Sequence, residues 1–187
     1  MASDLAPGLL VKRALDLAAV WHAGQVRKYP GAQVPYMSHC AGVALILARH
    51  GFADEVVAAG ALHDTLEDCG VTRAQIAAAC GEAVADLVVH VSEADKGASW
   101  EERKRAYLEH FQHKPWEAQA ITLADKLDNF RSIMVCAADH GDPWAMFKRG
   151  KPQQLERFDA LLAAARALPP HPLIDEVAAA LALLREV

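Results

Sequence analysis

Apolar residues recur every three or four positions through most of this chain of 187 residues, and this spacing is the period of an amphipathic α-helix. In the first such stretch Leu10, Ala14 and Ala18 fall on one face, and Gly24 ends the stretch. Residues 25–35 contain a glycine and two prolines and predict a loop. The glycines, prolines and capping residues in the rest of the chain mark the ends of further helices of the same kind. The predicted segments cover residues 4–22, 38–51, 54–68, 72–80, 81–92, 99–113, 115–140, 152–168 and 172–186, with a short irregular or helical link at 141–150.

The composition agrees with a helical fold, because the chain contains 38 alanines and 21 leucines, which are strong helix formers. Its length suits one domain, and no apolar run approaches the roughly 20 residues that span a bilayer. We therefore expect an all-α protein, a single compact helical bundle of about ten helices that spans residues 1–187 and contacts no membrane. Its core should lie in about residues 10–165, with the C-terminal helices packed on it.

Charge and cysteine content narrow the class of protein further. The formal net charge of −5 argues against a nucleic-acid partner with an extended phosphate backbone, although a local basic pocket is compatible with it. The first residues lack the basic-then-apolar pattern of a secretion signal. The four cysteines form no CxxC pair, and we expect reduced thiols, at least two of them buried, in a cytoplasmic protein. The oligomeric state stays open.

One helical segment carries an unusual set of ionisable groups. Residues 58–68 read AAGALHDTLED, so His63, Asp64, Glu67 and Asp68 interrupt an otherwise apolar stretch. On one continuous helix these four side chains would share a face. Burying three carboxylates together is costly unless a cation or a solvent-filled cleft receives them. The segment therefore indicates a metal or catalytic site, with a solvated polar face as the alternative.

Two further segments supply matching groups. His39 opens the second predicted helix, which we expect to pack beside the third, and Asp125 lies with Asp128 and Asn129 in an apolar part of the long helix. Two imidazoles and two carboxylates form a mixed nitrogen and oxygen ligand set with positions left open for water. Such a set suits Mn²⁺ or Fe²⁺ better than a closed structural zinc site. The candidate metal ligands are His39, His63, Asp64 and Asp125.

The other histidines have simpler explanations. His90 lies in an apolar run and is expected to be a hydrogen-bonded core residue. The remaining six lie near helix ends or in polar stretches, where a surface or helix-capping role is the better interpretation. They are His22, His50, His110, His113, His140 and His171.

The order of these motifs resembles the metal-binding pattern of HD-domain phosphohydrolases. Four segments are similar to the hydrolase domain of Rel/Spo stringent-response enzymes: Arg27-Lys28, Pro35-Tyr36 before His39, LHDTLED at 62–68 and LADKLDN at 123–129. Because the chain has no room for a synthetase domain, it resembles the stand-alone small alarmone hydrolases, over about residues 10–165. The resemblance implies an HD-domain helical fold.

The resemblance also implies an activity and a role for each residue. The implied reaction is Mn²⁺-dependent hydrolysis of the 3′-pyrophosphate of (p)ppGpp or (p)ppApp, giving the nucleoside 5′-phosphate and pyrophosphate, with Fe²⁺ or another divalent metal as an alternative. Glu67 and Asp68 would form the catalytic pair that positions the attacking water or accepts its proton. The implied substrate-binding residues are Arg27, Lys28, Lys96, Asn129 and Arg157.

Some positions depart from the family's usual residues, and we expect none of them to touch the metal ligands. These are Cys40, Cys69, Asp128 and Arg157. Their departure leaves base recognition open between guanine and adenine. Two other activities also stay open: a phosphatase acting on another nucleotide, such as the 2′-phosphate of NADPH or a nucleotide monophosphate, and a non-catalytic HD module that senses a nucleotide.

Overall fold

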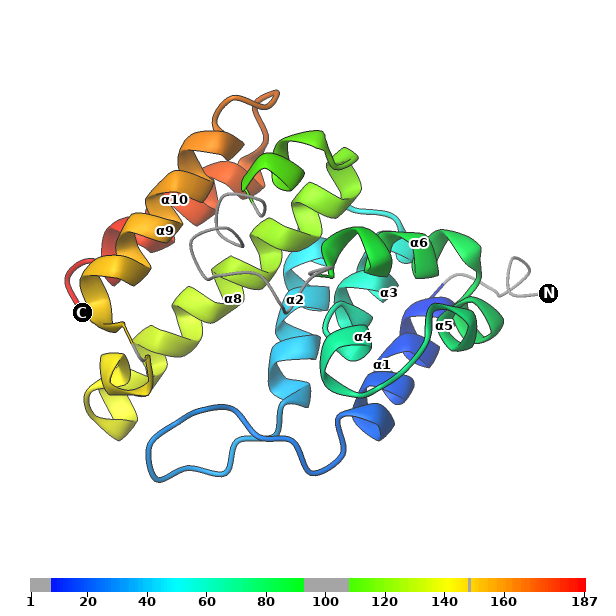
Figure 1. Ribbon diagram of the computed structural model, residues 1–187, viewed down its shortest axis with the longest axis horizontal. Coiled ribbons are helices and arrows are strands. Elements are labelled where there is room, and N and C mark those ends of the chain that lie inside the picture. The colour runs from blue at the N-terminus through cyan, green and yellow to red at the C-terminus, as the bar shows by residue number, and fades with distance from the viewer. Residues whose placement is uncertain (1–7, 93–107, 148) are drawn as a thin grey trace.

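Helix α8 (Trp116–His140) runs through the middle of the computed structural model, and other helices pack on both sides of it (Figure 1). The structure describes residues 8–92, 108–147 and 149–187. In these residues the chain forms helices and no strand, apart from one isolated antiparallel bridge between Val26 and Pro35. The prediction of an all-α fold is therefore confirmed.

The helices follow the predicted order, with bounds that differ by a few residues at most ends. The bounds are α1 Leu9–Trp21, α2 Met37–Arg49, α3 Asp54–Leu62, α4 Thr65–Asp68, α5 Arg73–Cys80, α6 Glu82–Val91, α8 Trp116–His140, the 3₁₀-helix η1 Pro143–Met146, α9 Gly150–Ala165 and α10 Pro172–Leu184; residues 108–113 are also helical.

The core lies along α8 and joins the two sides of the bundle. Helices α2, α3 and α6 contact α8 on one side, and α10 contacts it on the other. Leu123, Leu127 and Phe130 of α8 are fully buried between these elements. Because fully burying one such side chain stabilises the fold by roughly 1.5–3 kcal/mol, α8 anchors both sides. Among the helices of the described residues, none combines the length and hydropathy that crossing a membrane requires.

Gly60 allows α2 and α3 to approach each other closely. A Cβ atom at position 60 would lie 2.4 Å from Cδ1 of Leu47, which is fully buried in α2. A side chain at position 60 would push the two helices apart, since cores are packed as densely as organic crystals. This contact places the end of α3 against the α2 helix.

The predicted continuous helix over residues 54–68 is wrong. Helix α3 ends at Leu62, and α4 is a single turn that begins at Thr65. The side chains of the junction compete for the last carbonyl groups of α3: Nδ1 of His63 donates to the Gly60 carbonyl at 2.9 Å, and Oγ1 of Thr65 donates to the Leu62 carbonyl at 2.7 Å. The break changes the directions in which the side chains that follow it point.

One histidine takes a predicted role and another does not. His22 caps α1, which is one of the two roles predicted for it, although it is only 4% exposed and its ring stacks on Tyr36. His90 was expected in the core, but it is exposed, because α6 buries the face that carries Val84 and Val88. All four cysteines lie in described residues and are free thiols. Cys40, Cys80 and Cys136 are buried, as predicted for at least two of them.

Candidate metal centre and adjoining pocket

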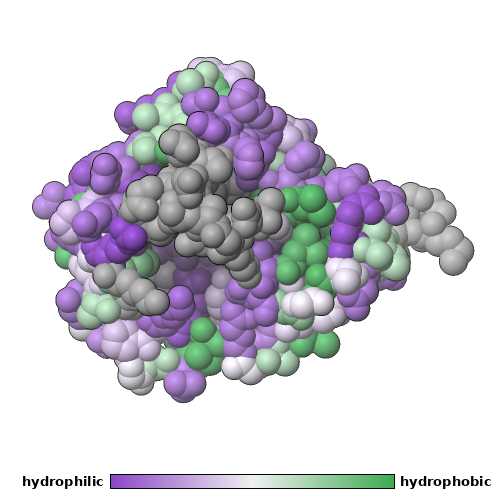
Figure 2. All heavy atoms as spheres, in the orientation of Figure 1, coloured by the Kyte–Doolittle hydropathy of each residue, from purple (hydrophilic) through white to green (hydrophobic). Residues whose placement is uncertain are grey.

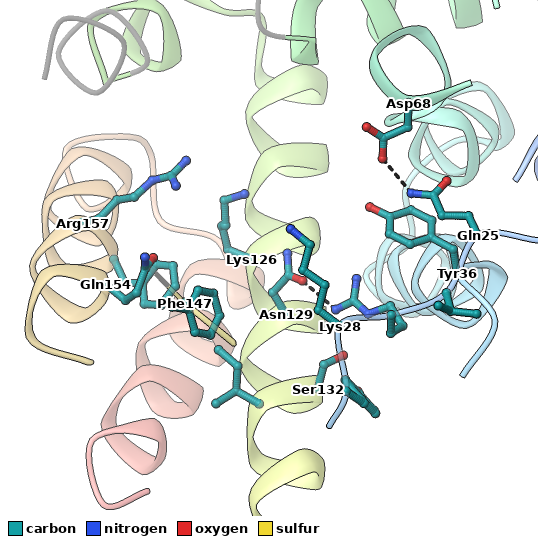
Figure 3. A pocket seen from close by; sticks show the side chains of 15 residues that line it. Gln25, Lys28, Tyr36, Asp68, Lys126, Asn129, Ser132, Phe147, Gln154 and Arg157 are labelled. Carbon is teal, nitrogen blue, oxygen red and sulfur yellow. Dashed lines mark hydrogen bonds between the residues drawn. The ribbon is translucent and has the colours of Figure 1, made fainter. Parts of the chain in front are cut away.

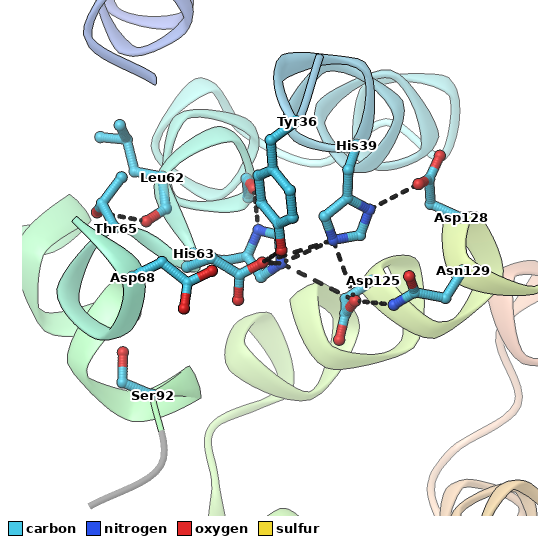
Figure 4. Close-up of polar contacts among 12 residues, drawn as sticks. Tyr36, His39, Leu62, His63, Thr65, Asp68, Ser92, Asp125, Asp128 and Asn129 are labelled. Carbon is cyan, nitrogen blue, oxygen red and sulfur yellow. Dashed lines mark hydrogen bonds and ion pairs between the residues drawn. The ribbon is translucent and has the colours of Figure 1, made fainter. Parts of the chain in front are cut away.

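The four predicted metal ligands meet where α2, the junction between α3 and α4, and α8 come together (Figure 4). Nε2 of His39 lies 3.2 Å from Nε2 of His63 and 3.3 Å from Oδ1 of Asp125. Oδ2 of Asp64 lies 2.9 Å from Nε2 of His63 and 3.6 Å from Nε2 of His39. Both imidazoles are buried. Three separate segments of the chain thus bring two imidazoles and two carboxylates to one point.

The hydrogen bonds of the two imidazoles fix which nitrogen faces the cluster. Nδ1 of His39 donates to Oδ2 of Asp128 at 2.6 Å, and Nδ1 of His63 donates to the carbonyl oxygen of Gly60 at 2.9 Å. Each neutral ring then presents the lone pair of Nε2. Two lone pairs and the carboxylate of Asp125 converge there and repel one another unless a proton or a cation lies between them.

A divalent metal fits this donor set. One ligand atom from each of His39, His63 and Asp125 lies within 4.8 Å of the other two, and the hydrogen-bonded Nδ1 atoms are the arrangement that metal-bound imidazoles adopt. Two imidazoles with carboxylates suit a transition metal that accepts mixed nitrogen and oxygen ligands.

A proton on His63 can take the place of the metal between these groups, and the pKa values of the cluster show how strongly it is attracted. Burial lowers the pKa of His63, but the charge of Asp64 and its hydrogen bond raise that pKa to about 9. Burial raises the pKa of Asp125, but the ammonium group of Lys126 beside it holds that pKa well below its usual range. Burial likewise raises the pKa of Asp64, but the positive charge of His63 and its hydrogen bond together outweigh burial, so the pKa of Asp64 lies below its usual value. Both carboxylates are therefore ionised at neutral pH.

Tyr36 is a partner of the cluster that the sequence prediction missed. Its hydroxyl donates a hydrogen bond to Oδ2 of Asp64. Burial, and then the charge of Asp64, raise the pKa of Tyr36 above its ordinary value, so the phenol keeps its proton and continues to donate. The available signal was its position three residues before His39, which places both side chains on one side of the first turn of α2.

The expectation that Asp128 does not touch the metal ligands is wrong. Its carboxylate accepts the hydrogen bond from His39 described above. Asp128 follows Asp125 by three positions on α8, so both side chains point toward the same neighbouring helices. The sequence motif contained this signal, because the spacing of the two aspartates already indicated a shared face.

The structure separates Glu67 from Asp68, which the sequence prediction treated as a pair on one face with His63 and Asp64. Glu67 lines a cavity of about 140 Å³ together with His63, Asp64 and other residues. Asp68 is exposed and lines a different pocket, where Oδ2 accepts a hydrogen bond from Nε2 of Gln25 at 2.9 Å. The prediction of one shared face fails for Asp68, because α4 begins in a new direction after the break and adjacent residues of its turn point about 100° apart.

The second pocket, of about 300 Å³, collects the predicted substrate-binding residues of the described chain. Figure 3 shows α8 beneath it, α9 with Arg157 on one side, and Lys28 and Tyr36 on the other. Arg27 and Asn129 also line it. Lys96, the fifth predicted substrate-binding residue, lies outside the described residues. The face drawn in Figure 2 is largely hydrophilic, and hydrophilic residues border a hollow near its centre.

Hydrogen bonds connect this pocket with the cluster of candidate metal ligands. Nη2 of Arg27 donates to Oδ1 of Asn129 at 2.7 Å, and Nδ2 of Asn129 donates to Oδ1 of Asp125. The backbone N–H of Arg27 donates to the Val34 carbonyl at 2.8 Å, which pairs the two arms of the loop before α2. These hydrogen bonds fix the position of the Arg27 guanidinium relative to the Asp125 carboxylate.

Comparisons with known proteins agree with this arrangement. Residues 14–145 match the model of a family described as HD domain. The chain is 38% identical over 141 residues to guanosine-3′,5′-bis(diphosphate) 3′-pyrophosphohydrolase MESH1 of Xenopus tropicalis. This match covers 74% of this chain and 76% of that protein. It is 40% identical over 128 residues to the MESH1 protein of Homo sapiens, covering 67% of this chain and 70% of that protein.

Two solved structures share the fold. One is described as a metazoan ortholog of SpoT that hydrolyzes ppGpp; it has a TM-score of 0.77 and 28% sequence identity, and the match covers 92% of this chain and 96% of that one. The other is lmo0812 from Listeria monocytogenes EGD-e, with a TM-score of 0.72 and 38% identity over 80% of this chain and 99% of that one.

Proposed function

Because the chain belongs to the HD domain family, we propose that it hydrolyses the 3′-pyrophosphate of guanosine 3′,5′-bis(diphosphate), the reaction for which its MESH1 relatives are named. The products are pyrophosphate and a nucleoside that keeps its 5′-phosphates. The observation that carries this proposal is the convergence of Nε2 of His39, Nε2 of His63 and the Asp125 carboxylate beside a pocket with arginine and lysine side chains.

The proposed cofactor is Mn²⁺, with Fe²⁺ or another divalent metal as the alternative. His39, His63 and Asp125 would hold the metal, and Asp64 would complete the set. Mixed imidazole and carboxylate ligands support this choice over the thiolate-rich sets of structural zinc sites. When bound, a divalent metal supplies a coordinated water of lowered pKa and polarises a phosphoryl oxygen.

The side chains around the ligands have separate tasks in the proposed reaction. Glu67 lines the cavity beside His63 and would accept the proton of the attacking water. Lys126 lines both cavities with its ammonium group on Asp125, so its charge can offset that of a phosphate group held there. The new bond joins the water oxygen to phosphorus, the bond to the ribose 3′ oxygen breaks, and that oxygen takes up a proton.

The larger pocket would hold the nucleotide. Its cationic side chains, Arg27, Lys28 and Arg157, would bind the phosphates, with Asp68 on the same wall. Ile133 and Phe147 line it as well and offer apolar surface to a purine ring. Because guanine and adenine both present such a ring, (p)ppApp is a second proposed substrate. Contact of Lys96 with the substrate and a cytoplasmic location remain predictions from the sequence.

A product-resolved assay tests the function. Purified protein is incubated with ppGpp, ppApp or NADPH, with and without Mn²⁺, and the products are separated by anion-exchange chromatography. We expect pyrophosphate from ppGpp or ppApp in the presence of Mn²⁺, none from His63→Ala, and full activity in Asp139→Asn, which removes an exposed carboxylate of α8 away from the site. Release of orthophosphate from NADPH alone, or no turnover with any of the three, would overturn the proposal.

A further inference from the structure

A carboxylate of another helix binds the ring nitrogen of His39 that points away from the ligand cluster. Nδ1 of His39 donates to Oδ2 of Asp128 at 2.6 Å, with the His39 side chain 1% exposed and the Asp128 side chain 14% exposed. Figure 4 shows the Asp128 carboxylate on the far side of the ring from His63 and Asp125. The opposite nitrogen, Nε2, is the one that faces the ligand cluster.

Gly42 of α2 provides the space that this carboxylate occupies. A Cβ atom at position 42 would lie 2.0 Å from Oδ1 and 2.8 Å from Cγ of Asp128. The backbone of Gly42 has no positive φ, so its conformation is open to any residue. The contact with Asp128, rather than backbone geometry, therefore explains a glycine at this position. Asp128 cannot yield easily, because its side chain is short and its other oxygen is bound to His39.

The two imidazoles are held by acceptors of different charge. His63 donates to a neutral backbone carbonyl, whereas His39 donates to a carboxylate. An anionic acceptor raises the basicity of the opposite ring nitrogen more than a neutral one does, and such partners orient imidazoles that bind metals. Asp128 also comes from the same helix as Asp125, so one rigid element fixes both a carboxylate ligand and the orientation of an imidazole ligand.

We propose that Asp128 is a positioning residue of the metal centre, and that Gly42 is the residue that admits it. Asp128 fixes the tautomer of His39 with hydrogen on Nδ1 and holds the ring so that the lone pair of Nε2 points at the ligand cluster. The inference rests on the proposed metal-dependent function, and it adds a residue pair that acts through His39 without touching metal or substrate.

The test compares Mn²⁺ affinity in matched variants, measured from the electron paramagnetic resonance signal of free Mn²⁺. Asp128→Asn keeps the size of the side chain and removes its charge, and we expect binding about 10–100-fold weaker. Asp139→Asn, an exposed carboxylate on the same helix, should bind as the original protein does. Gly42→Ala should weaken binding similarly, and the double variant Gly42→Ala/Asp128→Ala should be no weaker than Asp128→Ala alone, because the side chain that the new methyl group displaces is already absent there.

A second measurement reports on the imidazole without any metal. Long-range ¹H–¹⁵N correlation spectra of the metal-free protein give the tautomer of each histidine. We expect hydrogen on Nδ1 of His39 in the original protein and in Asp139→Asn, and a changed tautomer population in Asp128→Asn and Gly42→Ala. Thermal melting of each metal-free variant shows whether it is folded.

The outcomes separate this inference from the proposed function. Unchanged Mn²⁺ affinity and an unchanged His39 tautomer in folded Asp128→Asn would overturn the positioning role and leave the proposed function standing. Multiplied losses in the double variant would overturn the part assigned to Gly42. Failure of the original protein to bind Mn²⁺ would instead count against the proposed function, and the tautomer spectra would still decide whether Asp128 sets the His39 ring.

Discussion

The carboxylates of Glu67 and Asp68, neighbours in the chain, line different cavities. Glu67 lines the smaller cavity with the metal ligands, and Asp68 lines the larger pocket, where Gln25 binds it. Adjacent residues of a helical turn point about 100° apart, so one turn of α4 is enough to divide them. Under the proposed function, these two consecutive acids would therefore serve two different tasks.

Isosteric substitution of each acid should separate these tasks. We expect Glu67→Gln to lower kcat by about 10²–10⁴-fold with little change in KM, because it removes the group placed to accept the proton of the water. Asp68→Asn should have a smaller effect on kcat and a larger one on KM. Steady-state kinetics with ppGpp measure both values. If the two variants lost kcat equally and had the same KM, the proposed division of tasks between Glu67 and Asp68 would be contradicted.

Mn²⁺ should stabilise the folded protein. A ligand that binds only the native state at 100 times its Kd raises the free energy of unfolding by about 2.7 kcal/mol. Thermal denaturation with and without Mn²⁺ should show this increase, and excess chelator should reverse it. His63→Ala should lose the increase, whereas Asp139→Asn should keep it; a full Mn²⁺ effect in His63→Ala would place the ion elsewhere.

Removal of the Arg27 guanidinium should weaken substrate binding more than it slows the reaction. Arg27 lines the pocket and donates to Asn129. A hydrogen bond to a charged group contributes about 1.5–3 kcal/mol, so Arg27→Ala should raise KM by roughly 10–150-fold. Arg49→Ala, which removes an exposed arginine at the end of α2, serves as the control. An unchanged KM in Arg27→Ala would remove Arg27 from the binding site.

A methyl group at position 60 should destabilise the packing of α2 on α3. The Cβ atom would lie 2.4 Å from a buried methyl of Leu47, and overpacking a dense core costs about 1–3 kcal/mol. Urea denaturation of Gly60→Ala should therefore show a lower midpoint. Since the same two helices carry His39 and the residue before His63, Mn²⁺ binding should weaken as well. A midpoint equal to that of the original protein would show that the helices separate without cost.

The contact between α10 and the rest of the bundle should depend on pH through Glu176. Burial raises the pKa of this carboxyl, but the hydrogen bond from His50 and the charge of Arg131 lower it below its ordinary value of 4.5. A lowered pKa stabilises the fold above pH 4.5, and this stabilisation is lost as the pH falls through the folded-state pKa.

Glu176→Gln should therefore lower the free energy of unfolding at pH 7 by about 1 kcal/mol, as expected for a partly exposed ion pair. The difference between the variant and the original protein should shrink as the pH is lowered below 4.5. Urea denaturation over a pH series measures it. A difference that stays constant down to pH 3 would mean that the carboxylate charge contributes nothing.

The helical period of the sequence predicted the order of the elements because the buried faces of α1, α2 and α8 repeat regularly. It failed at residues 63–68, where the His63 and Thr65 side chains compete with the backbone for carbonyl groups. Such competition leaves no trace in a pattern of apolar and polar positions. The exposure of His90 could have been predicted, because Glu82 and Asp86 precede it at intervals of four residues and mark a polar face of α6.

The clustering of the two imidazoles and two carboxylates was predictable because such side chains stand out in apolar helices, whereas their role as metal ligands stays a prediction. Their partners were less accessible, since Tyr36 meets Asp64 and Arg27 meets Asn129 only after distant segments pack together. Asp128 is an intermediate case: its spacing from Asp125 indicated a shared face, but the space beside Gly42 became visible only in three dimensions.

The position of α9 across the pocket from the candidate metal ligands has a consequence for the evolution of this protein's sequence. Arg157 and Gln154 lie on α9, whereas His39, His63 and Asp125 belong to elements on the other side of the pocket or beneath it. Under the proposed function, substitutions on α9 would therefore alter which nucleotide is accepted without moving a candidate metal ligand. Selectivity and hydrolytic chemistry would then evolve separately in this fold.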